Sequence, residues 1–451
     1  MNIGRRTFLG GTGAAALASV TAFEANAGVP ALGDVPNDYF LSRANPVANR
    51  DQKELETKAI ELYHRDDIRE AIKRTAFGFE MVVKSVVSER IWAMFPGFLE
   101  SYAFRSILLA VNSDANYPKV LRVYSPAAKW MGNDVPESKW GWENPDNAYR
   151  IIPVAYGGQY VIRGQRMPNP SRHVSYVLVT DTNTSITAGL LEQSGMQVAP
   201  DGSFEITLDD LPANGRKNHI QLTPDAQYVF IRDTMSDWSQ TPNALRVERL
   251  NAPAHPPLTM DQLAGVAARV MQLGIAPNHY WMGLGQQQVV RAPIMMGPVG
   301  GLLTQMSTGG WFRLAPDEAV IVTADAVQSE YHSFVIYDLW GRSLEYRDHF
   351  TSLNNAQMDA DRDGRFTYVI APSDPGANNW LDTTGQTELR VNMRWQGLAS
   401  GAKVPAIETR IVKLADLASA LPAGVARATP ADRRKQIAER QRQHDVRYAS
   451  T

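Results

Sequence analysis

Apolar residues recur at helical spacing in the first quarter of the chain, and the spacing changes to that of strands afterwards. Between Asp51 and Val111, charged residues fill the gaps in a periodic apolar pattern. Its members are Leu55, Ile60, Leu62, Ile68, Ile72, Phe79, Val82 and Val86. This period follows one face of an α-helix. We therefore expect a helical region over residues 28–111 whose apolar face packs on another part of the protein.

Short β-rich runs separated by Gly, Pro, Asn and Asp begin after Asn112, as in Gln159–Arg163 and Val174–Val179. Runs of this kind are typical of antiparallel sheets. They predict one sheet region over residues 112–255 and a second over 309–400. Between them, Thr259 and Gln262 have the spacing of a helix capping box, which predicts a helical connector over 256–308.

The tail, residues 401–451, is expected to be helical. One helix is predicted near Val412–Leu421, and another starts at Thr429-Pro430, a cap followed by proline at the first helical position. The segment Arg433–Arg447 is polar on nearly every side. This pattern predicts a helix that faces solvent or a partner protein.

The two β-rich blocks resemble each other. The matched segments are Asp201–Phe204 with Asp363–Phe366, Asn218–Ile220 with Asn379–Leu381, Ser175–Leu178 with Ser333–Ile336, and Arg232 with Arg394, the last pair expected at strand ends. We expect a mainly β fold with added helices: two similar antiparallel β-sandwiches side by side, with a binding cleft at their junction. The alternative is chance similarity, because strands and turns use few residue types.

The N-terminus predicts export. Arg5-Arg6-Thr7-Phe8-Leu9 precedes a Gly- and Ala-rich run and the small-x-small site Ala25-Asn26-Ala27. These elements describe a twin-arginine signal over residues 1–27 and a mature protein, periplasmic or secreted, that begins near Gly28. The alternative is an N-terminal helix with two chance arginines.

The composition of the chain limits the kinds of site and binding partner that we expect. The 451 residues contain no cysteine, which excludes disulfides, thiolate metal sites and a cysteine nucleophile. The net charge is −2, and it becomes −3 without Arg5, Arg6 and Glu24, since two positive charges and one negative are removed. We expect no nucleic-acid partner, and no later apolar stretch is long enough to span a membrane. A small-molecule ligand is the expected partner.

Several motifs resemble an uncharacterised family of exported bacterial proteins, the domain of unknown function 1214. They are Asn144–Tyr149, Asp237-Trp238, Leu245–Leu250, Tyr337–Trp340, Thr351–Gln357 and Asp374–Thr383, and the similarity runs from about residue 140 to 420. The resemblance implies a jelly-roll β-sandwich. The resemblance implies no reaction, cofactor or catalytic residue.

One difference between the two β-rich blocks is that the first has His219 where the second has Trp380. An aromatic site at that position would therefore exist only in the second copy.

Metal and cofactor motifs are weak. Asp359, Asp361 and Asp363 precede a glycine like the start of a calcium loop, but Ile370 stands where a bidentate Glu is required, so we expect a turn. A zinc site that joins His332 and His349 would depend on the fold, and we expect no metal. The chain has no Gly-x-Ser-x-Gly elbow, phosphate-binding loop or dinucleotide fingerprint, so we expect no cofactor.

The candidate site is a polar and aromatic set in the second block. We assign acid–base roles to Tyr337, Asp338 and His349. The expected substrate-binding residues are Trp340, Tyr346, Arg347, Asn354, Asn355, Gln357, Asn379, Trp380 and Asp382. The alternative for most of these residues is structural: the amides and carboxylates satisfy long loops, and the tryptophans belong to the core.

Three functions fit these observations. The first is an exported, cofactor-independent lyase, isomerase or hydrolase that acts on a small apolar molecule such as an aromatic, terpenoid or steroid compound, with the Met-rich segment 283–306 as a lid. The second is a β-sandwich that binds a carbohydrate or another ligand without catalysis. The third is a structural envelope protein that binds a partner through its C-terminal helix.

Overall fold

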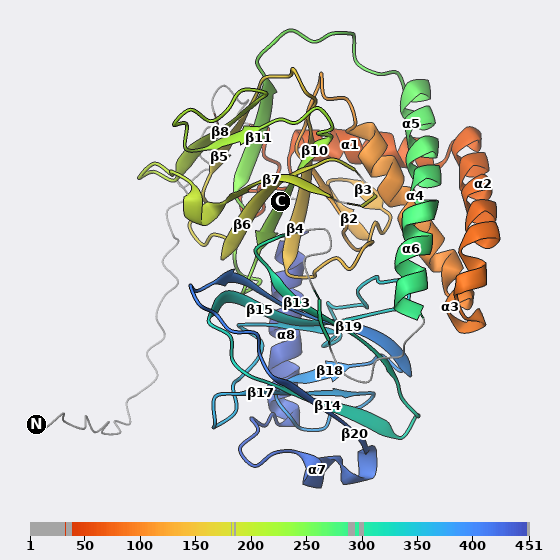
Figure 1. Ribbon diagram of the computed structural model, residues 1–451, viewed down its shortest axis with the longest axis vertical. Coiled ribbons are helices and arrows are strands. Elements are labelled where there is room, and N and C mark those ends of the chain that lie inside the picture. The colour runs from red at the N-terminus through yellow and green to blue at the C-terminus, as the bar shows by residue number, and fades with distance from the viewer. Residues whose placement is uncertain are drawn as a thin grey trace, which may run out of the picture.

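The computed structural model describes residue 32 and residues 38–181, 183–184, 186–286, 294–296 and 302–448. They form two β-sandwiches, one above the other in Figure 1, with a group of helices along one side. The mainly β fold with helices before, between and after the sheets is therefore confirmed. The predicted export signal lies outside the described residues, as do residues 287–293 and 297–301 of the predicted lid.

The first sandwich consists of a five-stranded sheet with the order β1-β4-β10-β6-β7 and a four-stranded sheet with the order β11-β5-β8-β9. The strands are β1 Leu121–Val123, β4 Asn147–Pro153, β5 Tyr160–Gln165, β6 His173–Val179, β7 Thr187–Glu192, β8 Ser203–Asp209, β9 His219–Gln221, β10 Tyr228–Thr234 and β11 Ala244–Arg249. A small hairpin, β2 Ala128–Trp130 and β3 Asn133–Val135, precedes β4. Apolar residues of both sheets, such as Ile231 and Ile206, meet in one core.

The second sandwich repeats this plan, with the sheet orders β12-β13-β19-β15-β16 and β20-β14-β17-β18. Its strands are β12 Ile294–Met296, β13 Met306–Arg313, β14 Glu318–Ala324, β15 Ser329–Tyr337, β16 Ser352–Asn354, β17 Phe366–Ala371, β18 Trp380–Asp382, β19 Glu388–Leu398 and β20 Ile407–Lys413. The core contains Phe334, Val391 and Tyr368, again from both sheets. Because β12 and β20 belong to these sheets, the sandwich begins before residue 309 and extends past residue 400.

The internal repeat extends to the strand register. In both sandwiches one pair of strands is parallel, β8 with β9 and β17 with β18, within otherwise antiparallel sheets. Arg232 on β10 lies opposite Ser175 on β6, and Arg394 on β19 lies opposite Ser333 on β15. The prediction that these arginines end their strands was wrong, because both lie within them. The two copies therefore share their strand order and the register of this strand pair.

Two groups of helices form one layer beside the first sandwich (Figure 1). The layer contains α1 Arg50–Tyr63, α2 Asp66–Val82, α3 Glu89–Ala93, α4 Phe95–Val111, α5 Met260–Leu273 and α6 Ile275–Gln286, with a 3-10 turn at Lys84–Val86. Phe98 of α4 stacks on Trp340 from the second sandwich at 4.4 Å between ring centroids. Tyr102 donates to the carbonyl of Met271 at 2.8 Å, which fastens α4 to α5. Within the described ranges, no helix is both long and apolar enough to cross a membrane.

The tail differs from its prediction at one point. Val412 belongs to β20, and the expected helix near it is reduced to a 3-10 turn at Leu414–Asp416 and α7 Leu417–Ala420. A further 3-10 turn, Gln193–Gly195, follows β7. The last helix, α8 Pro430–Val446, starts as predicted: Thr429 and Asp432 form a capping box ahead of the proline.

Helix α8 lies along the second sandwich and its C-terminal end reaches the first (Figure 1), and one side of the helix is buried. Arg433, Arg440 and Arg447 are spaced by seven residues and are at least nine-tenths buried. Arg433 donates to the carbonyl of Asn378 at 2.9 Å, Arg440 to Ser352 Oγ at 2.7 Å and Arg447 to the carbonyl of Pro145 at 2.7 Å. The helix is polar all round because its buried side binds backbone and side-chain oxygens, which apolar residues could not do.

Candidate functional site

The junction between the sandwiches is centred on a buried carboxylate, Asp146. Its Oδ1 accepts from Trp238 Nε1 at 2.6 Å and from Asn354 Nδ2 at 2.8 Å, and its Oδ2 accepts from the Tyr331 hydroxyl at 2.5 Å. All four side chains are buried, and two of them come from each sandwich. Asp146, Trp238 and Asn354 all lie in motifs that carry the family resemblance. These motifs therefore hold the two sandwiches together.

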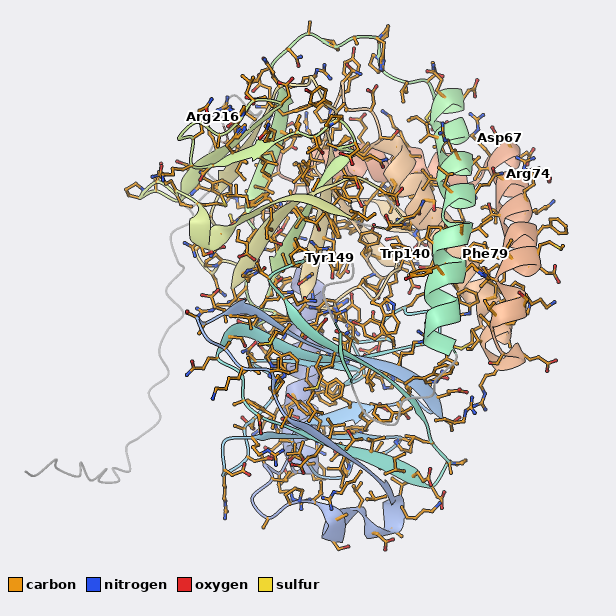
Figure 2. All side chains as sticks on the ribbon, in the orientation of Figure 1. Asp67, Arg74, Phe79, Trp140, Tyr149 and Arg216 are labelled. Carbon is orange, nitrogen blue, oxygen red and sulfur yellow. The ribbon has the colours of Figure 1, made fainter. Side chains whose placement is uncertain are left out.

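The five-stranded sheets present their outer faces to each other at this junction. Thr234 at the end of β10 donates to Gln396 Oε1 on β19 at 2.9 Å. Figure 2 places Tyr149 of β4 at the same boundary. Since side chains alternate along a strand, Arg232 shares a face with Thr234, and Arg390 and Arg394 share one with Gln396. The fold thus brings three arginines into the space where the sheets meet.

These residues, Arg232, Arg390 and Arg394, are called the arginine cluster below. They are only 8%, 5% and 7% exposed. Arg394 donates to the Tyr337 hydroxyl at 2.6 Å and to the carbonyl of Trp142 at 2.6 Å. Charged side chains are almost never buried to this degree unless they are paired.

Two of the three guanidinium groups have buried N–H groups without a hydrogen-bond partner. Arg390 lies 5.2 Å from the ring centroids of both Trp142 and Trp311, and its Nε and Nη2 have no hydrogen-bond partner. Arg232 lies 4.3 Å from the ring centroid of Phe230, and its buried Nη1 is likewise unpaired. Stacking on aromatic rings stabilises a cation but leaves its N–H groups unsatisfied.

Burial governs the electrostatics of the cluster. It lowers the pKa of Arg390 to about 10 and also lowers the pKa of Arg232, which the neighbouring Arg394 charge lowers further. It raises the pKa of the Tyr337 and Tyr149 hydroxyls, although nearby guanidinium charge opposes that shift. The cluster is therefore a site where an anion would be stabilised strongly.

A buried carboxyl, Glu143, stands next to the cluster. Its Oε1 accepts from the backbone N–H of Ser343 at 2.8 Å, and its Oε2 has no partner. Burial raises the pKa of Glu143 to about 7, against the opposing charge of Lys139. This carboxyl can exchange a proton near neutral pH.

An open cleft of about 440 Å³ lies on the outer side of Glu143. Its walls are Pro126, Ala127, Glu137, Lys139, Asp338, Arg342, Ser343, Leu344, Glu345, Tyr346, Arg347 and His444. Its charges are already paired: Arg342 bonds Asp338 at 2.9 Å and Glu137 at 3.2 Å, and Arg347 bonds Asp445 at 2.7 Å. The cleft therefore offers less unsatisfied binding capacity than the arginine cluster.

The fold separates the three residues to which we assigned acid–base roles. Tyr337 is buried in the arginine cluster, whereas Asp338 holds its own turn by accepting from the N–H of Trp340 at 2.9 Å and by pairing with Arg342. His349 is partly exposed and pairs with Asp382 at 2.8 Å. Each residue has a different set of partners, so the three do not form one catalytic group.

The predicted binding residues are also distributed. Tyr346 and Arg347 line the cleft, Trp340 lies in the helical core, and Asn354 binds Asp146. The other five residues make structural contacts. Asn355 accepts a hydrogen bond from the backbone N–H of His332, and Gln357 accepts one from Arg440. Asn379 donates to the carbonyls of Asp359 and Thr367, Trp380 packs on Phe350, and Asp382 accepts from the N–H of Thr384.

The metal alternatives gain no support from the fold. Asp361 and Asp363 lie in a tight turn in which Gly364, at φ +85°, donates its N–H to the carbonyl of Asp361. His332 is buried in the second sandwich, stacked on Trp395, and burial lowers its pKa to about 3. In the part of the chain that the structure describes, no three metal-ligating side chains come together.

Sequence reasoning missed Arg390, Glu143 and Trp142, and it noted Arg232 and Arg394 only as repeat markers. A signal for them was present. Arg390, Asn392, Arg394 and Gln396 alternate with Leu389, Val391, Met393 and Trp395. Such alternation shows a polar strand face, but only the fold reveals that a second sheet covers it.

Comparison with protein families gives a match in the second sandwich. Residues 316–397 match the family described as "Protein of unknown function (DUF1214)". Comparison with curated proteins gives no match. A crystal structure of an uncharacterised protein from Burkholderia cenocepacia is similar, with 25% identity, a TM-score of 0.65, and coverage of 80% of this chain and 99% of that one.

The VPA0106 protein from Vibrio parahaemolyticus covers 69% of this chain and 98% of its own, at 12% identity and a TM-score of 0.36. The Burkholderia match extends the shared fold well beyond the second sandwich. The segment that matches the family model, 316–397, contains strands β14 to β18 and most of β19.

Proposed function

We propose that this protein binds a small anionic molecule between its two sandwiches, at the arginine cluster. The observation that carries the proposal is that Arg232 and Arg390 are buried with unpaired N–H groups. A buried cation without a partner costs several kcal/mol. Such a cost is retained at functional sites, where a ligand supplies the missing partner.

The aromatic rings around the cluster define the rest of the ligand. Trp142, Trp311 and Tyr337 offer flat apolar surfaces beside the guanidinium groups. This surrounding supports a carboxylate, or another anionic group, on an aromatic or apolar body. It favours such a ligand over the uncharged apolar compounds and neutral sugars expected from the sequence.

Catalysis at the same place is a second candidate. Glu143, with a pKa raised to about 7, lies close enough to Tyr337 for its charge to affect that hydroxyl. A proton-exchanging carboxyl beside a bound anion would suit a cofactor-independent lyase, isomerase or hydrolase. Mass spectrometry of the protein incubated with each bound compound would detect a product, and Glu143→Gln should abolish it.

Export through the twin-arginine pathway remains part of the proposal, so the ligand would be a periplasmic or extracellular compound. A polar helix that binds a partner protein is less well supported, because Arg433 and Arg440 of α8 and Arg447 at its C-terminal cap form bonds within the molecule.

The test is a comparison of Arg390→Met with Arg269→Met, an exposed arginine on α5. Carboxylates and their methyl esters are screened by calorimetry and thermal shift. We expect carboxylates alone to bind, and Arg390→Met to bind them more weakly than the wild-type protein while the unliganded variant melts at a higher temperature. Unchanged carboxylate binding in Arg390→Met, or a lowered melting temperature, would contradict the proposal.

A further inference from the structure

The duplicated strands place two equivalent cationic positions face to face. Arg232 lies opposite Ser175 in the first sandwich, and Arg394 lies opposite Ser333 in the second. Both pairs are on outer sheet faces, and the pKa of Arg232 responds to the charge of Arg394. The Ser175 hydroxyl is buried and has no hydrogen-bond partner. Each sandwich therefore contributes its own anion-binding group to one space.

The nearby carboxylates Asp338 and Glu388 oppose the lowering of the Arg390 pKa, but both are shared with other cations. Glu388 is paired with Arg90 at 2.9 Å and with Arg313 at 2.8 Å. Asp338 is paired with Arg342. Glu143 lies beside the cluster but forms no ion pair with it.

From this arrangement, and on the basis of the proposed function, we infer that the ligand carries two anionic groups, one bound by Arg232 of the first sandwich and the other by Arg390 of the second. Arg394 is held between them by Tyr337 and Trp142 and contributes charge to both. The class is a dicarboxylate or a comparable dianion with an aromatic or apolar body, since a monoanion would leave one unpaired guanidinium buried.

The experiment compares dianions with matched monoanions on the full chain. The probes are straight-chain dicarboxylates from succinate to sebacate and terephthalate, each tested beside its monomethyl ester by calorimetry. The ester keeps the body and removes one charge. We expect at least one dicarboxylate to bind about tenfold or more tightly than its ester, because it gains a second charge-assisted hydrogen-bonded contact.

Single variants then locate the two contacts. Arg232→Met and Arg390→Met should each reduce the affinity for the dicarboxylate to about that of its ester, while the affinity for the ester changes only about twofold because one site remains. Arg269→Met is the control for overall charge. Circular dichroism and melting curves verify that each variant is folded.

The outcomes separate this inference from the proposed function. If esters and dicarboxylates bind equally, or if the advantage of the dicarboxylate survives in both single variants, the two-group inference is wrong and anion binding at the cluster stands. If no carboxylate of either kind binds the wild-type protein, both proposals are overturned.

Discussion

The two sandwiches have the same strand order, but their corresponding outer faces carry different residues. On β10 the outward positions are Tyr228, Phe230, Arg232 and Thr234, and on β19 the equivalent positions are Arg390, Asn392, Arg394 and Gln396. In the first copy, Tyr228 and Phe230 join the apolar core beneath the helices. In the second copy the same positions hold a cation and an amide. At these two positions, one framework therefore carries apolar packing in the first copy and polar side chains in the second.

A second difference concerns the short parallel strands. His219 on β9 bonds the Thr207 hydroxyl at 2.9 Å, whereas Trp380 on β18 packs against Phe350 and lies 5.5 Å from the Arg433 guanidinium, measured to its ring centroid. Trp380 of the second copy thus forms part of the surface on which α8 packs. The expectation that it could mark a ligand site only in the second copy gains no support from these contacts.

The largest effect should come from breaking the junction that joins the copies. Asp146→Ala leaves the polar hydrogens of Trp238, Tyr331 and Asn354 without their acceptor in a buried place, and we expect a loss of about 4 kcal/mol of unfolding free energy. Denaturant titration measures it. Asp146→Asn, which keeps one acceptor oxygen, should lose less. Equal, small losses would show that the sandwiches are held by other contacts.

Helix α8 should be the next most sensitive element. Arg440→Ala removes bonds to the Tyr346 carbonyl, Ser352 and Gln357. We expect a loss of about 3 kcal/mol, because a charged donor is removed from buried acceptors. Arg434→Ala, on the exposed side of the same helix, should change stability by less than about 0.5 kcal/mol. Similar changes in unfolding free energy for the two variants would indicate that α8 is a solvated helix.

The pH dependence of stability should reveal Glu143. Its folded pKa of about 7 lies above the ordinary value of 4.5, so the folded state binds more protons than the unfolded state between these values. Its contribution is therefore fully present below about pH 4.5 and is lost as the pH rises through about 7. Relative to Glu143→Gln, wild type should lose about 3 kcal/mol over this range. Parallel stability curves for the two proteins would contradict the prediction.

The smallest effect should come from making the second copy more like the first at β18. Trp380→His removes ring contacts with Phe350 and Arg433, and we expect a loss of about 1–2 kcal/mol. Trp380→Phe keeps an aromatic surface and should recover part of it. If the histidine variant is as stable as wild type in thermal denaturation, the aromatic ring is not needed to seat α8.

Periodicity and turn residues predicted the architecture well because they reflect local preferences. The repeat was visible in Asp201-Gly202 and Asp363-Gly364, since hairpin turns with positive φ favour glycine. The capping box at Thr429 likewise gave the start of α8. The predicted end of the second sandwich, at residue 400, was too early. Its last strand, β20, pairs with β14 across almost a hundred residues of sequence, and local preferences do not reveal such a pairing.

The candidate site was harder to predict, because its residues meet only through packing of the two sheets. Polar and aromatic residues at Tyr337–Gln357 look alike in sequence whether they bind a ligand or satisfy a loop. Asp338 holds a turn and Asn354 holds the junction, while Tyr337 beside them belongs to the arginine cluster. Burial without a partner distinguishes Arg390, and burial is a property of the tertiary structure.

The bond between Thr234 and Gln396 relates the two copies to the subunits of a symmetric assembly. These residues occupy equivalent positions in the two copies, and they touch each other. In a homodimer with twofold symmetry, residues near the axis contact their own counterparts. Thr234 and Gln396 therefore meet in one polypeptide as counterpart residues meet near the axis of a symmetric dimer.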